Sequence, residues 1–166
     1  MGNKAVADTG PIIHLSEIDL VNVFNIFSQI LIPKEVSHEL IKNKIKIPKF
    51  FIIKEIKPEH KDKIKIFTNQ HDLDIGESEA IVLALQEKAD YFLTDDSDAR
   101  LVAKKYSLEV HGTIGIILRA FREKIINKNK AIEKVNQLHT NSSIFITSDL
   151  IAEVIRALEN FRKTRK

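Results

Sequence analysis

Acidic residues gather at four places in this chain where a strand would end or a helix would begin. Each place follows or opens an apolar run, so the carboxylates should lie close to packed structure. The clusters are Asp8, Glu39, Glu77 with Glu79, and Asp95 with Asp96 and Asp98. Crowded carboxylates repel one another and need a counter-charge. In a chain with no cysteine and only 6 histidines, the fitting counter-charge is a hard divalent cation with oxygen ligands.

Asp8 and the Asp95–Asp96 pair each follow a short apolar segment that is typical of a strand. In open α/β sheets, sites form beyond the carboxyl ends of the strands. Each of these acids could instead be the N-cap of the following helix, a role that Asp favours. Two strand-end acids in one small sheet favour a site. Adjacent residues leave a strand end in different directions, so only one member of the Asp95–Asp96 pair is expected to be a ligand.

Glu77 and Glu79 open a helix whose next residues, 80–85, are all apolar, so the start of this helix should lie near the core. The two side chains are about 200° apart around the helix axis, so only one of them is expected to bind a given ion. Acids in a first helical turn are also favoured by the helix dipole. Glu39 lies within a helix, and by its position alone it would be expected to face solvent.

Short apolar segments alternate with helical segments, which indicates βαβ units around a parallel sheet. Strands are expected at 4–7, 30–32, 50–56, 91–94 and 108–111. Helices are expected at 10–27, 33–42, 58–69, 76–88, 97–106 and 113–123, with a loop at 70–75. The C-terminal part adds a helix near 131–138, a possible strand at 144–147 and a helix at 149–161.

Composition limits the class of protein. A chain of 166 residues with 43% hydrophobic content fits one globular domain that buries its own core. No apolar run is long enough for a membrane span, and no signal-peptide pattern is present at the start. The lack of cysteine excludes disulfides and suits a reducing compartment, so a cytoplasmic location is expected.

Charge is divided unevenly along the chain. Residues 1–118 hold 15 Lys and Arg against 18 Asp and Glu, whereas residues 119–166 hold 11 against 5. An acidic first part with a basic tail would suit a polyanionic substrate. A solvated, lysine-rich surface explains the same distribution equally well.

The order and spacing of these motifs resemble the PIN-domain family, in particular its VapC-like members. The segments that carry the resemblance are ADTGPIIHLSEID, LIPKEVSHELI, LDIGESEAIVLAL, YFLTDDSDARLVAKK and VHGTIGIILRA. The tail resembles the C-terminal extension of one subgroup. The resemblance implies a three-layer α/β/α fold with a short central parallel sheet. It also implies a single domain over 1–166, with a catalytic core at about 1–123 and a helical extension at about 124–166.

The resemblance also implies a site. It carries the family's four acids onto Asp8, Glu39, Glu77 and Asp96, with Glu79 and Asp95 as open alternatives for the last two. These acids would bind one or two Mg²⁺ or Mn²⁺ ions. Thr9 and Thr94 match hydroxyl positions of the family that lie near the site. Glu stands where the third acid is often Asp, which leaves the number of ions open.

The activity implied is that of a metal-dependent endoribonuclease, a hydrolase of phosphodiester bonds that leaves 5′-phosphate and 3′-hydroxyl ends. The metal would activate water and stabilise charge on the phosphate. A toxin of a toxin–antitoxin pair is the leading expectation, with RNA as substrate, a small antitoxin as partner and a homodimer as assembly. The alternatives are an RNA-maturation nuclease and a non-catalytic module that binds RNA or protein.

Overall fold

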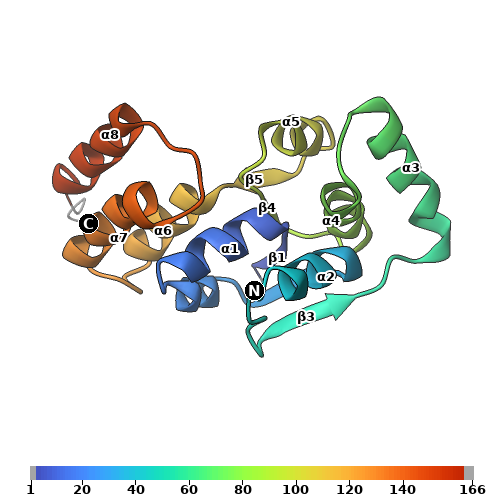
Figure 1. The fold of residues 1–166 in the computed structure, drawn as a ribbon, viewed down its shortest axis with the longest axis horizontal. Helices are drawn as coiled ribbons and strands as arrows, with labels where there is room; N and C mark the ends of the chain where they lie inside the picture. The colour runs from blue at the N-terminus through green and yellow to red at the C-terminus, as the bar shows by residue number, and fades with distance from the viewer. Residues whose placement is uncertain (1–2, 163–166) are drawn as a thin grey trace.

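A computed structural model describes residues 3–162 and contains one five-stranded parallel sheet (Figure 1). The strand order is β3-β2-β1-β4-β5, and every neighbouring pair is parallel. The strands are β1 (Lys4–Ala7), β2 (Gln29–Pro33), β3 (Phe51–Lys54), β4 (Tyr91–Leu93) and β5 (Glu109–His111). Four of them lie within the ranges expected from the sequence, and β2 extends its expected range by one residue at each end.

Helices flank this sheet to give three layers, α/β/α, as the sequence predicts. They are α1 (Thr9–Glu17), α2 (Lys34–Lys42), α3 (Lys61–Gln70), α4 (Ile75–Gln86), α5 (Ser97–Lys105), α6 (Thr113–Arg122), α7 (Lys128–Asn141) and α8 (Ser148–Glu159). Two short 3₁₀ helices, η1 (Val21–Ile26) and η2 (Pro58–His60), precede β2 and α3. No helix among residues 3–162 is long and apolar enough to cross a membrane.

The central strand β1 is the most enclosed element of the sheet, since Ala5, Val6 and Ala7 have no exposed surface. Ala7 is paired with Leu93, so β1 and β4 end side by side. The backbone N–H of Asp8 donates to the carbonyl of Leu93 (2.9 Å) and continues this pairing by one residue. The residues that follow these two strands are therefore held together.

Helix α4 covers the middle of the sheet and contacts β1, β2 and β4. Seven of its residues are buried, which matches its nearly uniform apolar sequence. Its N-terminus lies beside α2, which also contacts β2 and β3. The start of α4 is thus close to the carboxyl ends of the central strands.

The prediction of one continuous helix over 10–27 was wrong, because α1 ends at Glu17 and a separate 3₁₀ helix, η1, begins at Val21. Asp19 adopts a left-handed backbone conformation (φ 54°), which Asp tolerates better than most residues. The N–H of Leu20 then donates to the carbonyl of Leu15 (2.9 Å), a bond that closes a helix end. These local bonds replace continuation of the helix.

The possible strand at 144–147 was also wrong, since this segment is an irregular connection between α7 and α8. Exposed Phe145 next to buried Ile146 imitates the alternation of a strand. Its polar groups bind helices instead, because Ser143 donates to Glu17 and the Ile146 carbonyl lies 3.1 Å from Nδ1 of His139. The helices on either side of it are confirmed.

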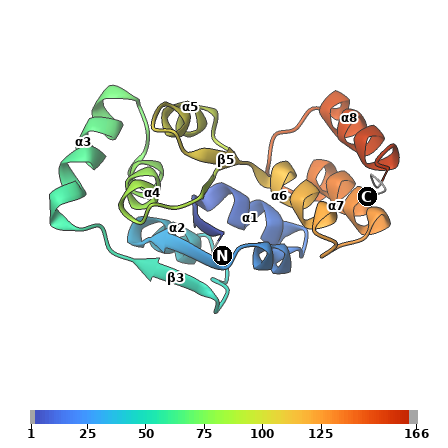
Figure 2. The same ribbon diagram turned by 180° about the vertical axis from the view of Figure 1, so that it is seen from behind.

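The last three helices form a compact group at one end of an elongated molecule, and α3 forms the other end (Figures 1 and 2). Helix α7 packs between α6 and α8, and α6 packs against α1 and η1. Nζ of the buried Lys134 donates to the Ile18 carbonyl at the end of α1 (2.5 Å). Helix α7 is thereby joined to the N-terminal part of the chain.

Candidate active site

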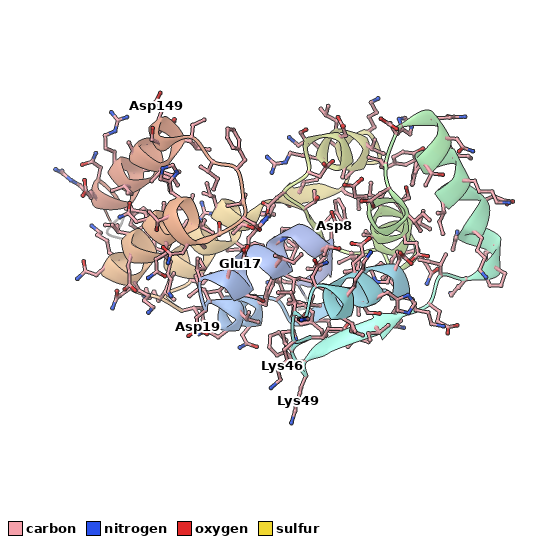
Figure 3. The ribbon with its side chains drawn as sticks, in the orientation of Figure 1. Asp8, Glu17, Asp19, Lys46, Lys49 and Asp149 are labelled. Carbon is pink, nitrogen blue, oxygen red and sulfur yellow. The ribbon has the colours of Figure 1, made fainter. Side chains whose placement is uncertain are left out.

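Six carboxylates from four parts of the chain line one open hollow of about 450 Å³ beyond the ends of β1 and β4. They are Asp8, Glu39, Asp74, Glu77, Asp95 and Asp96. We call this hollow the acidic pocket. Asp8 lies near the centre of the molecule, at the start of α1 (Figure 3). Residues 143–145 of the α7–α8 connection also line the pocket, so the C-terminal helices contribute to it.

Asp8 is both the N-cap of α1 and the most buried carboxylate of the pocket, with 6% of its surface exposed. Its Oδ1 accepts from the backbone N–H of Thr9 (2.8 Å), and its Oδ2 accepts from Oγ1 of Thr94 (3.1 Å). Burial raises the pKa of Asp8 to about 7, and the nearby Glu77 adds to this shift. The cap and site interpretations of Asp8 are therefore compatible.

Glu39 reaches the acidic pocket from α2, contrary to the solvent exposure expected from its position alone. Its Oε2 accepts a short hydrogen bond from Oγ1 of Thr9 (2.5 Å). Burial raises the pKa of Glu39, with a further contribution from Asp74. Gly76 makes room for this carboxylate, because a Cβ at that position would lie 2.5 Å from Oε1 of Glu39.

Glu77 lies in the first turn of α4 and forms a capping box with Asp74. Oδ1 of Asp74 accepts from the N–H of Glu77 (2.7 Å), and Oε2 of Glu77 accepts from the N–H of Asp74 (3.0 Å). Burial raises the pKa of Glu77 to about 7, with additions from Asp74 and Asp96. The sequence analysis missed Asp74, although the spacing Asp-x-x-Glu before an apolar run is a capping signal that could have identified it.

Glu79 faces away from the acidic pocket, as expected for a residue on another side of the helix from Glu77. Its Oε2 accepts from the backbone N–H of Glu35 (3.1 Å). It lines a separate hollow with Lys34, Lys61 and Lys65. The geometry thus brings Glu77 to the other acids and leaves Glu79 outside them.

Asp95 and Asp96 also divide between two tasks. Oδ2 of Asp95 lies 2.6 Å from Nδ1 of His14, and both of its oxygens accept from Thr113 (N–H to Oδ1, 2.7 Å; Oγ1 to Oδ2, 2.5 Å). Burial alone would raise the pKa of Asp95, but the hydrogen bonds from His14 and Thr113 hold it below the ordinary value. Asp96 is the N-cap of α5, one of the two roles that the sequence leaves open for it, and its Oδ1 accepts from the backbone N–H of Ala99 (2.8 Å).

His14 also lines the acidic pocket, beside Asp95. It comes from the helix that follows β1, whereas Asp95 follows β4. The pairing depends on the adjacency of these two strands. No local motif in the sequence indicates it.

The pocket fits a divalent ion in the chemistry of its donors. Asp8, Glu39, Glu77 and Asp96 offer hard carboxylate oxygens, and the raised pKa of Asp8 and of Glu77 reflects burial and mutual repulsion that a cation would offset. Within residues 3–162, no three acidic or histidine side chains are grouped closely enough to hold an ion as they stand. Their oxygens cap helices or accept from hydroxyls, so side-chain rotation would be part of binding.

Comparison with known proteins agrees with this fold. A family model described as DUF3368, a PIN domain, matches residues 4–160. Among solved structures, the chain is similar to a PilT N-terminus domain protein from the hyperthermophilic archaeon Sulfolobus solfataricus P2, with a TM-score of 0.56 and 20% identity. The alignment covers 70% of this chain and 92% of the other. At this identity the likeness supports the fold alone. None of the curated proteins compared with the chain matches it significantly.

Proposed function

Because this chain belongs to the PIN-domain family, whose members are generally nucleases, we propose that it is a divalent-metal-dependent endoribonuclease. The observation that carries the proposal is the convergence of Asp8, Glu39, Glu77 and Asp96 on one pocket from separate elements. A carboxylate cluster in which burial raises pKa values is expected at a functional site more often than at a structural one.

In this proposal, Asp8, Glu77 and Asp96 hold one or two Mg²⁺ or Mn²⁺ ions, and Glu39 completes the set or orients water. A bound ion lowers the pKa of the water that it holds and stabilises negative charge on the phosphate. Oγ1 of Thr9 donates to Glu39 and Oγ1 of Thr94 donates to Asp8, so each hydroxyl fixes the orientation of one carboxylate. Asp95 and Glu79 act outside this set.

The biological setting is proposed to be a toxin–antitoxin pair, as in the VapC-like members that the sequence resembles. The partner would be a small antitoxin that places an Arg on the carboxylates of the pocket, because a guanidinium pairs with carboxylates through two parallel hydrogen bonds. The protein would act as a homodimer. Co-purification with the product of an adjacent small gene, and light scattering of the purified protein, test these two points.

Cleavage of a panel of end-labelled single-stranded RNAs tests the activity. We expect cleavage with Mn²⁺ or Mg²⁺, loss of cleavage with EDTA, and 5′-phosphate and 3′-hydroxyl ends on the products. Asp8→Asn should lower the rate at least about a hundredfold, because it removes one charged donor from the pocket. The matched control Asp62→Asn changes an exposed carboxylate on α3 and should cleave normally. Cleavage that persists in Asp8→Asn would exclude the proposed activity and indicate a contaminating nuclease.

A further inference from the structure

Phe145 is 93% exposed, although it is a large aromatic residue beside the acidic pocket. The next most exposed large apolar side chain among the described residues is Ile41, at 65%. An exposed phenylalanine leaves about 150–250 Å² of apolar surface in water, and contact with another molecule would remove that surface from water. Phe145 is therefore a candidate contact for a bound molecule.

The segment that carries Phe145 is held on both sides, so its exposure does not come from a loose loop. The carboxylate of Glu17 accepts from the N–H of Ser143 (3.0 Å) and from its Oγ (2.7 Å). On the other side, Ile146 is buried and its carbonyl lies 3.1 Å from Nδ1 of His139. Glu17 is at the end of α1 opposite to Asp8, so one helix connects the pocket to this anchor (Figure 3).

A second hollow, of about 460 Å³, lies against Phe145 and shares Asp95, Ile144 and Phe145 with the acidic pocket. We call it the side hollow. Its apolar wall includes Val110, Ile114 and Leu118, and its polar groups include Arg100 and His111. Nε of Arg100 is buried and has no hydrogen-bond partner among the described residues.

These features match one nucleotide of a single strand. A nucleobase has flat apolar faces that stack on aromatic side chains, polar edges that accept and donate, and an adjoining anionic phosphate. The side hollow combines an aromatic ring, apolar walls and a guanidinium, and it continues into the pocket where a phosphate would be cleaved.

We propose that Phe145 is the stacking platform for a nucleobase of single-stranded RNA next to the scissile phosphate, with the side hollow as the subsite for that nucleotide. This inference rests on the proposed nuclease function, which supplies the phosphate position. It assigns the α7–α8 connection, and so the C-terminal helices, a direct role in binding substrate. Phe145 is a binding residue in this account and takes no part in the chemistry.

Substitution of Phe145 tests the proposal, because the loss of a residue that only binds substrate should raise KM and leave kcat nearly unchanged. Phe145→Ala should raise KM for RNA about tenfold and leave kcat within a factor of about two, because stacking of one base contributes to binding in that range. Phe145→Tyr should retain normal KM, and Phe145→Leu, which keeps an apolar side chain without the ring, should behave like Phe145→Ala. Phe50→Ala removes another exposed phenylalanine and is the matched control. An unchanged KM in Phe145→Ala overturns the proposal.

A binding experiment separates this proposal from the nuclease activity. The chain has no Trp, so Phe145→Trp creates a single fluorescent reporter, and Phe50→Trp creates its control. Both are made with Asp8→Asn and titrated with short single-stranded oligoribonucleotides in Mg²⁺. Saturable quenching of the reporter at position 145 alone supports stacking, and it does so even if the wild-type protein cleaves nothing.

Two kinds of outcome contradict the stacking site. The first is the absence of quenching at position 145: binding seen by anisotropy without quenching would place the bases elsewhere, and a failure to bind any RNA would leave no base to stack on this residue. Emission that changes with protein concentration in the absence of RNA would assign Phe145 to a contact between two copies of the chain. In either case the cleavage assay with Asp8→Asn still decides the nuclease proposal independently.

Discussion

At the scale of single residues, the carboxylates of the acidic pocket also serve as helix caps. Asp8, Asp74 and Asp96 cap α1, α4 and α5 through hydrogen bonds from backbone N–H groups. A cap fixes the position of a carboxylate at a strand end while leaving a second oxygen for another partner. Asp8 is thus shown to be a cap, and this role is compatible with its proposed role as a ligand.

Asp8→Asn should stabilise the metal-free protein at about pH 8. Burial raises the pKa of Asp8 to about 7, so at that pH the folded protein carries an ionised side chain that burial and Glu77 disfavour. The amide is neutral and of the same shape, so the free energy of unfolding should rise by at least about 1 kcal/mol. Urea denaturation in EDTA measures the difference in unfolding free energy between the wild type and Asp8→Asn. A decrease would show that the charge of Asp8 supports the fold.

Asp95→Ala should have the opposite effect, because Asp95 pairs with His14 and accepts from the first N–H of α6. Removing this buried acceptor should cost about 3 kcal/mol of unfolding free energy and leave any stabilisation by metal intact. The lowered pKa of Asp95 means that its contribution is present at neutral pH and is lost as pH falls below its usual range, near 3.8. Thermal melts at several pH values test this, with exposed Asp98→Ala as the control.

The sequence predicted the positions of these acids better than their roles. Helical geometry separated Glu77 from Glu79, and strand ends predicted that Asp8 and the Asp95–Asp96 pair would be neighbours. Asp95 is bound by Thr113 and His14, which favours Asp96 as the proposed ligand; these two partners are distant in sequence from Asp95 and come near it only through the fold. Such long-range hydrogen bonds have no periodicity, so no local pattern predicts them.

At the scale of elements, regular alternation made the strands and most helices predictable, because each buries one face or a whole run against its neighbours. The two wrong predictions fell on segments whose course is set by the backbone conformation of one residue or by a few hydrogen bonds. Asp19 in a left-handed conformation ends α1 early, and the attachment of Ser143 to Glu17 keeps the α7–α8 connection irregular. The second of these segments carries Phe145 to the acidic pocket.

Gly76 at the start of α4 offers a test that separates the site from the fold. Gly76→Ala puts a methyl group where Oε1 of Glu39 lies, so that flexible carboxylate must move. Alanine favours a helix over glycine by about 1 kcal/mol, so stability should be unchanged or higher. Metal affinity, measured by calorimetry, and cleavage should both fall by about tenfold or more, because a displaced ligand weakens the whole site.

Gly115→Ala is the matched control for this experiment, because Gly115 also lies in a helix, α6. A Cβ there would be 3.5 Å from the ring of His111, an ordinary contact. This variant should gain stability and keep wild-type metal affinity. Equal metal affinity in Gly76→Ala and Gly115→Ala would remove Glu39 from the set of ligands.

At the scale of the whole molecule, the connection between the C-terminal helices α7 and α8 forms part of the wall of the acidic pocket. Lys134 ties α7 to the end of α1, and Ser143 to Phe145 line the pocket whose carboxylates come from the first part of the chain. Residues 119–166 carry 11 Lys and Arg against 5 Asp and Glu, so this part of the chain would attract a polyanion.

The pH dependence of metal binding should appear in the stability of the whole protein. Asp8 and Glu77 each have a pKa raised to about 7, so protons occupy both sites at about pH 5 and compete with any cation. Because these folded-state pKa values exceed the unfolded ones, the metal-free protein should lose stability as pH rises from about 4 to about 7. The increase in stability on metal binding should therefore be largest at about pH 8.

Thermal melts with millimolar Mg²⁺ or Mn²⁺, each set against EDTA, measure this linkage. At a free metal concentration of about one hundred times Kd, the expected gain is about 2.7 kcal/mol, or a rise in Tm of about 5–10 °C for a chain of this size. The rise should nearly vanish at about pH 5 and be smaller in Asp8→Asn at every pH. A metal response that is independent of pH would mean that the ion binds away from Asp8 and Glu77, because only there must it displace protons near neutral pH.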